Sequence, residues 1–205
     1  MKTKIVAISG HIGSGKDEFA KIMAELSVIG VERHAFADKV RDITELLTGY
    51  KMKLINKAGE PFINNVYNYT QEDKNVFLPI WNKTIGQCLQ QIGTEVFRYN
   101  FDPDTWVKAL IGTANRCADD GYIFVCPDCR FPNEADAILE MGGIVIRLEG
   151  DPLNIRKNST RDLNHPSETA LDNYTRFTKT IRNVIPDINI FRIQVNEIIR
   201  EYVYQ

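Results

Sequence analysis

The feature that most constrains this chain is a glycine-containing loop near its start, in the segment ISGHIGSGKDEFA. Gly10 is followed by four residues and then by Gly15 and Lys16, which is the spacing of a phosphate-binding loop, or P-loop. An apolar run over residues 4–9 precedes it, and a helical pattern over 15–27 follows. Such glycines let consecutive amides face an anion at the positive end of a helix, while the lysine reaches the β- and γ-phosphates. The loop therefore predicts a nucleoside triphosphate site, with ATP as the expected ligand, formed by Gly10, Ile12, Gly13, Ser14, Gly15, Lys16 and Asp17.

Asp17 stands where this motif normally carries Ser or Thr, whose hydroxyl ligates magnesium. A carboxylate is also a hard oxygen ligand, but it adds negative charge beside the phosphates. Two roles stay open. Asp17 either belongs to the Mg²⁺ shell, directly or through water, or it caps the helix, where an acid is favoured by about 0.3–1 kcal/mol. The metal role is our working expectation.

Composition places the chain among ordinary globular proteins. Its 205 residues are 43% hydrophobic and 25% charged, which predicts one domain over 1–205 with a buried core. A formal charge of −2 does not favour long nucleic acid as a partner. We find no signal peptide and no apolar stretch long enough to span a bilayer, so we expect a soluble, cytoplasmic protein, in the host cytoplasm if it is viral. The lone CxxC of Cys126 and Cys129 is weak evidence for a metal or redox site.

Hydrophobic periodicity predicts alternating strands and helices. Strands are expected at 4–9, 32–36, 122–127, 144–148 and 179–185, and helices at 15–27, 38–48 (ending at Gly49), 83–99, 103–118, 132–141 and 187–202. This order predicts a three-layer, doubly wound α/β domain with a mainly parallel five-stranded sheet. Residues 50–82 lose the regularity and are expected to be an insertion or a substrate-covering segment. The polar stretch 150–166 is expected to be a short lid.

A guanine-reading N-K-x-D is the signature of signalling GTPases, and the nearest string here, Asn56-Lys57-Ala58-Gly59, lacks the acid. A small kinase suits the chain better, because a kinase needs an acceptor pocket and a lid that excludes water.

Four further strings make a resemblance specific: FADKVRD, IGQCLQQIGTEVFR followed by DPDTWV, DCRFPNEADAI and NHPSETAL. With the GKD loop, they resemble the bacteriophage-type deoxynucleoside monophosphate kinases, within the broader P-loop nucleoside monophosphate kinase fold. The resemblance runs from residue 5 to about 172 and leaves 50–82 uncovered. It implies Mg²⁺-assisted transfer of a phosphoryl group from ATP to a deoxynucleoside monophosphate, giving the diphosphate.

The resemblance also implies which residues contact the acceptor. Arg41 would hold its phosphate, Trp106 would wall or stack on the base, and Glu134 would orient Arg130 or accept from a base amino group. The full implied set is Ala37, Asp38, Arg41, Gly93, Thr94, Arg98, Trp106, Asp128, Arg130 and Glu134.

Phosphoryl transfer depends on positioning and on cations that stabilise anionic oxygens. The expected catalytic cations are Lys16, Arg130, Arg156 and Arg161, the last two from the lid.

Other roles remain open for several of these residues. Trp106 would serve equally as a core residue. Arg98 would form a surface i,i+3 pair with Glu95. His165 would fix the base of the lid, with Ser167 capping the next helix and Glu168 in its first turn.

Two alternatives to this function are kept, namely a P-loop kinase of another small metabolite and a nucleotide-binding module without turnover. The oligomeric state stays open, with a homodimer among the options.

Overall fold

A five-stranded sheet forms the centre of the protein, whose computed structural model describes residues 4–55, 61–156 and 163–204. Its strands are β1 (Ile5–Gly10), β2 (Val31–Arg33), β7 (Ile123–Cys126), β8 (Ile144–Glu149) and β9 (Lys179–Arg182). They lie in the order β2-β7-β1-β8-β9, and each neighbouring pair is parallel. The predicted five-stranded parallel α/β fold is confirmed.

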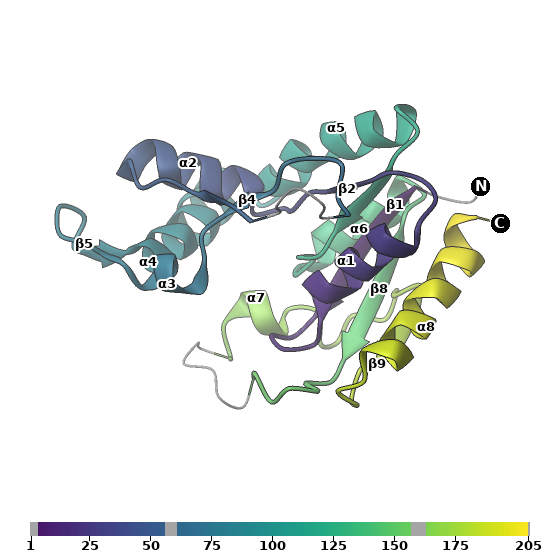
Figure 1. Cartoon of the computed structure of the whole chain (residues 1–205). Helices are drawn as coiled ribbons and strands as arrows, with labels where there is room; N and C mark the ends of the chain where they lie inside the picture. Colours follow the sequence, from purple (N-terminus) through teal and green to yellow (C-terminus); the bar gives the residue numbers. More distant parts are fainter. Residues whose placement is uncertain (1–3, 56–60, 157–162, 205) are drawn as a thin grey trace.

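Helices cover both faces of this sheet (Figure 1). Alternate residues of β1 point to opposite sides, as a strand requires. Val6 and Ile8 pack with α1 (Lys16–Leu26) and α8 (Ile188–Ile198), whereas Ile5 and Ala7 pack with α5 (Thr105–Asp119) and α6 (Pro132–Glu140). A π-helix, η2 (Ile199–Val203), continues α8. The sheet and its two helical layers form the predicted three-layer arrangement.

A second group of short elements lies to the left of the sheet in Figure 1. Helix α2 (Asp38–Thr48) ends at Gly49, which has the predicted left-handed conformation, with φ of 71°. This helix packs against α4 (Ile85–Gln90) and the π-helix η1 (Gln91–Tyr99), and α3 (Gln71–Asn75) packs against α4. Two small antiparallel pairs complete the group, β3 (Lys53–Leu54) with β4 (Tyr67–Asn68) and β5 (Phe77–Leu78) with β6 (Lys83–Thr84).

These short elements correct two sequence expectations. The single helix predicted over 83–99 is instead β6, α4 and η1 in succession. In the segment expected to be irregular, 50–82, the described residues form β3, β4, α3 and β5. Strands of two residues and a helix of five are too short to produce a hydrophobic period, so periodicity could not reveal them.

The predicted lid is described in part. Residues 150–156 follow β8, and α7 (Pro166–Thr169) lies near its end. Residues 157–162, with the predicted lid residue Arg161, lie outside the described residues. None of the helices in the described ranges is both long and apolar enough to cross a membrane.

Candidate active site

Two neighbouring cavities lie where the parallel strands end at their carboxyl edge. The first, the loop cavity, is about 670 Å³ and is lined by Gly13, Lys16 and other residues of the phosphate loop. The second, the helix cavity, is about 520 Å³ and is lined by residues from α2, α4 and η1. Ligands of open parallel sheets bind at this edge, so both cavities have the position expected of a ligand site.

The phosphate loop needs its glycines for two separate reasons. Gly13 and Gly15 have φ of 84° and 92°, a left-handed region that residues with a Cβ rarely adopt. A Cβ on Gly13 would also lie 2.3 Å from Asp151 Oδ1, and one on Gly15 would lie 2.8 Å from Asn183 Nδ2. Asn183 Nδ2 donates to the Ser14 carbonyl at 3.0 Å, so the residue after β9 helps to hold the loop in shape, and Asp151, which follows β8, lies against Gly13.

Lys16 begins α1 and folds back over the loop. Its Nζ donates to the carbonyls of Gly10 at 2.7 Å and His11 at 2.8 Å. Burial and, to a lesser extent, the nearby Arg130 guanidinium lower the pKa of Lys16 to about 8, against the opposing effect of Glu168. The loop thus holds a desolvated cation, which a bound polyphosphate would stabilise in its charged form.

Asp17 pairs with an arginine from the neighbouring strand. Its Oδ1 lies 2.7 Å from Arg33 Nη2, and the Asp17 side chain is 80% exposed. It lies in the first turn of α1, whose N-cap residue, Gly15, has no side chain that could cap the helix. No group of three or more His, Cys, Asp or Glu side chains in the described residues is arranged for a metal ion. Magnesium commonly uses one or two carboxylates with waters and substrate phosphates, and the exposed Asp17 fits such a partial ligand.

Glu168 also reaches the phosphate loop, although the sequence suggested only a place in the first turn of a helix. Its Oε2 accepts from the Ile12 amide at 3.1 Å, and its Oε1 accepts from Arg130 Nη1 at 2.7 Å. Burial raises the pKa of Glu168, but Arg130 and the Ile12 amide outweigh burial, so that the net shift is downward. The Glu168 carboxylate therefore already accepts a hydrogen bond from one of the backbone amides of the loop. The cap of α7 is His165, whose Nδ1 accepts from the Ser167 amide, so the expectation of a Ser167 cap is wrong.

Asp128 links the end of β7 to the start of α2 through hydrogen bonds. Its two carboxylate oxygens accept from the amides of Phe36 at 2.9 Å and Ala37 at 3.1 Å. Arg41, one turn into α2, donates to Asp38 Oδ1 at 2.5 Å.

The structure brings almost all of the predicted acceptor residues to one cavity. Asp38 lines a third cavity of about 370 Å³ beside β2 instead. The predicted residues that line the helix cavity are Ala37, Arg41, Gly93, Thr94, Arg98, Trp106, Asp128, Arg130 and Glu134.

Arg98 is a buried residue, so the alternative of a surface pair with Glu95 is wrong. Its Nη2 lies 2.6 Å from Glu134 Oε1, and its guanidinium carbon lies 3.8 Å from the centre of the Phe131 ring. Burial raises the pKa of Glu134 to about 7, against the opposing effect of Arg98. The other oxygen of Glu134 accepts from the Arg130 amide at 2.8 Å. Glu134 therefore orients the backbone of Arg130, and Arg98 neutralises Glu134.

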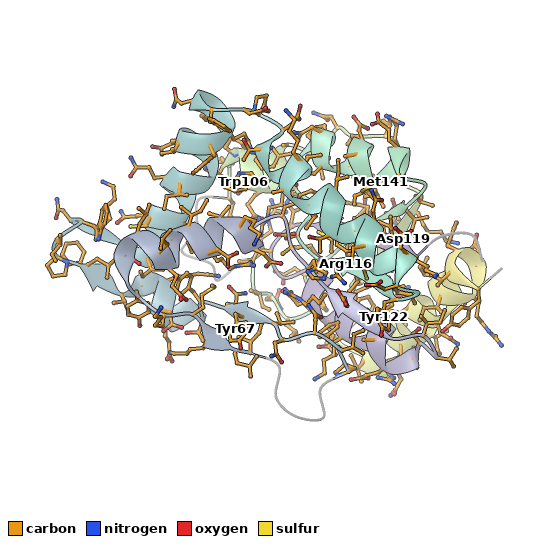
Figure 2. The ribbon with its side chains drawn as sticks, turned by 90° about the horizontal axis from the view of Figure 1, so that it is seen from above. Tyr67, Trp106, Arg116, Asp119, Tyr122 and Met141 are labelled. Atoms are coloured by element: carbon orange, nitrogen blue, oxygen red, sulfur yellow. The ribbon has the colours of Figure 1, made fainter. Side chains whose placement is uncertain are left out.

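Trp106 lies near the first turn of α5, at the opposite end of that helix from Arg116 (Figure 2). Its side chain is nearly buried, its Nε1 donates to the Gly93 carbonyl at 2.8 Å, and it packs against Phe97. It lines both the helix cavity and the third cavity, so the ring is a core residue that forms a wall between them.

Arg156, the expected lid arginine among the described residues, lines neither main cavity. Of residues 150–156, Pro152, Leu153 and Ile155 line the loop cavity. The backbone amide of Arg156 donates to Asp151. Arg130, by contrast, lines both main cavities.

The CxxC cysteines are core residues. Cys126 and Cys129 are free thiols with almost no exposed surface, and burial raises both pKa values well above the ordinary thiol range. Protonated, enclosed thiols do not suit redox exchange.

Comparisons with known proteins show a limited similarity to solved structures. No protein-family model matches the chain, and no curated protein sequence matches it. A provisionally assigned kinase from Chloroflexus aurantiacus superimposes with a TM-score of 0.48 at 12% identity, over 98% of each chain. A sugar kinase from Janibacter superimposes with a TM-score of 0.46 at 17% identity, over 98% of this chain and 94% of the other. At these scores neither structure carries an argument about function, which depends instead on the site.

The Arg98–Glu134 pair gives a prediction about stability. Arg98→Met leaves the Glu134 carboxylate buried without its cation, so we expect a loss of about 3–5 kcal/mol in the free energy of unfolding, measured with urea. Adding Glu134→Gln to that variant should recover part of the loss. The control is Arg176→Met, which removes an exposed partner of Asp136 and should cost at most about 1 kcal/mol. An Arg98→Met protein as stable as the control would contradict the buried pair.

Proposed function

We propose that this protein is a P-loop kinase that transfers the γ-phosphoryl group of ATP to a deoxynucleoside monophosphate. One observation carries the proposal: the loop cavity and the helix cavity share Arg41, Lys74, Asp128 and Arg130 as lining residues. A donor phosphate in the first cavity and an acceptor phosphate in the second would therefore meet at a common, mainly cationic boundary. Two adjoining pockets with such a boundary are what a two-substrate phosphotransferase requires.

In the proposed reaction, an oxygen of the acceptor phosphate forms a bond to the γ-phosphorus while the bond from that phosphorus to the β–γ bridging oxygen breaks. The electron pair of the broken bond stays with ADP, and the products are ADP and a deoxynucleoside diphosphate. The attacking oxygen is already anionic, so the chemistry needs positioning and charge stabilisation rather than a strong general base. Lys16 would hold the donor phosphates, and Arg130 would contact the transferred group.

Magnesium, when bound with ATP, would neutralise phosphate charge, and Asp17 would contribute a carboxylate or a water-mediated contact to it.

The helix cavity supports a nucleotide-sized acceptor. Its volume of about 520 Å³ lies within the usual range for small-ligand pockets. Its lining combines apolar Val40, Leu89 and Trp106 with the amide side chains of Gln87 and Gln90. Amides can both donate to and accept from the edge of a base, whereas the apolar side chains can contact its faces. The acceptor class also follows from the family resemblance of the four sequence strings.

Turnover of a substrate panel tests this function. The purified chain is incubated with ATP, Mg²⁺ and each deoxynucleoside monophosphate, ribonucleoside monophosphates and phosphorylated sugars, and ADP release and product mass are measured. We expect at least one deoxynucleoside diphosphate to form. Lys16→Ala should abolish turnover and weaken ATP binding. Phosphorylation of only a non-nucleotide acceptor would replace our proposal with another small-metabolite kinase, and ATP binding without product would indicate a binding module.

The lowered pKa of Lys16 predicts how ATP affinity depends on pH. Phosphates stabilise the charged lysine, so ATP binding should raise its pKa. Lys16 of the free protein is largely protonated below pH 8, where affinity should change little; above pH 8 the free protein loses this proton and binding must restore it. We expect the Kd to rise by up to about tenfold per pH unit above pH 8.

Calorimetry in two buffers of different ionisation enthalpy measures that proton uptake. Titrations with ATP at pH 7.5 and 9 should show uptake mainly at pH 9. Lys16→Arg is the matched control, because its guanidinium stays charged over this range. No proton uptake by the wild type at pH 9 would contradict the assignment.

A further inference from the structure

We propose that Lys74, in the segment that the family resemblance leaves uncovered, is a catalytic residue that contacts the donor and acceptor phosphates at the boundary between the two cavities. The inference rests on the proposed function and extends it to a residue outside the resemblance. Lys74 lies in α3 and lines both cavities, a property it shares with Arg41, Asp128 and Arg130. Lys74 thus reaches that boundary from the group of short helices and strand pairs beside the sheet, to which α3 belongs.

A dense set of hydrogen bonds fixes the helix that carries Lys74. Thr70 caps α3, with its Oγ1 accepting from the Asp73 amide, while Asp73 Oδ2 accepts from the Thr70 amide at 2.8 Å and from its hydroxyl at 2.7 Å. Asp73 Oδ1 lies 2.7 Å from Lys53 Nζ and accepts from the Tyr50 hydroxyl at 3.1 Å. The Asp73 side chain is only 2% exposed. The residue next to Lys74 is therefore an anchor that joins α3 to the chain around residues 50–53.

Gly86 lets α3 approach α4 closely. A Cβ on Gly86 would lie 3.1 Å from the carbonyl oxygen of Lys74 and 3.6 Å from the Cβ of Lys74. Gly86 also lines the helix cavity. Without a side chain at this position, the backbone of Lys74 can lie against α4, beside the helix cavity that both residues line.

The charges at the boundary explain why a further cation is useful. Arg41 lies beside Asp38, and Arg130 lies beside Glu168, so these carboxylates offset part of the positive charge that the two arginines bring to the boundary. The donor γ-phosphate and the acceptor phosphate together bring several negative charges to one place, and their repulsion opposes their approach. An ammonium group is a compact charge with three donors and can contact oxygens of both phosphates at once. Lys74 would thus stabilise the transferring group as well as the encounter of the two substrates.

Steady-state kinetics of full-length variants test this role. Lys74→Met removes the charge but keeps much of the side-chain length, and we expect kcat to fall by about 100-fold or more. Lys74→Arg should recover part of that loss because it restores a cation. The Kd of ATP measured without acceptor should change by less than about threefold, since Lys16 and the loop amides hold the donor. The matched control is Lys51→Met, whose side chain is 80% exposed and pairs with Glu45. It should leave kcat unchanged.

A second variant separates the position of Lys74 from its charge. Gly86→Ala keeps the lysine but crowds its backbone, so it should lower kcat by a smaller factor while the urea midpoint stays near that of the wild type. If the wild type phosphorylates a deoxynucleotide and Lys74→Met retains kcat within about threefold, the role of Lys74 is wrong and the proposed function stands. If the wild type phosphorylates no deoxynucleotide, the proposed function fails and the role of Lys74 fails with it.

Discussion

The site depends on the parallel direction of the five strands, because that direction brings the end of each strand to one edge of the sheet. Gly10 ends β1, Arg33 ends β2, and Asp128 follows β7 at the same edge. Asp151 and Asn183, which follow β8 and β9, support the phosphate loop from the side. The bonds from Asp128 to the backbone at the start of α2 then connect the phosphate loop region to the helices that line the second cavity.

Ion pairs organise the charge around the two cavities. Arg33, Arg41, Arg98 and Arg130 each pair with a carboxylate, and burial makes an unpaired charge costly. The pairs differ in their distance from the phosphate loop. Arg98 and Glu134 form an enclosed support, whereas Glu168 accepts from the Ile12 amide of the loop. A phosphate in the loop would have to compete with that carboxylate for the amide.

The sequence predicted the sheet and the phosphate loop well because both leave local signals. The buried strands show apolar runs, and Gly49 marks the end of α2. The capping box of Thr70 and Asp73 was also a readable local signal, but the rest of 50–82 lacked any period that would have supported a helix there. Nine-residue η1 was expected as ordinary helix, since composition does not distinguish the two forms.

Contacts between distant segments could not be predicted. The partner of Arg98 is Glu134, 36 residues away, and the contact of Glu168 with Ile12 spans 156 residues. The family resemblance identified the residues around the helix cavity, but burial decides their roles. Trp106 and Arg98 form its inner wall with little exposed surface, whereas Lys74 came from a segment that the resemblance did not cover.

The central claim is that the two cavities are adjoining halves of one phosphoryl-transfer site. The most direct test is the affinity of a compound in which adenosine and a deoxynucleoside are joined by a polyphosphate chain, measured by calorimetry. If both halves bind at once, joining them should lower the Kd by about 100-fold or more relative to ATP alone. A Kd equal to that of ATP, with the deoxynucleoside monophosphate still able to bind beside the compound, would contradict the claim.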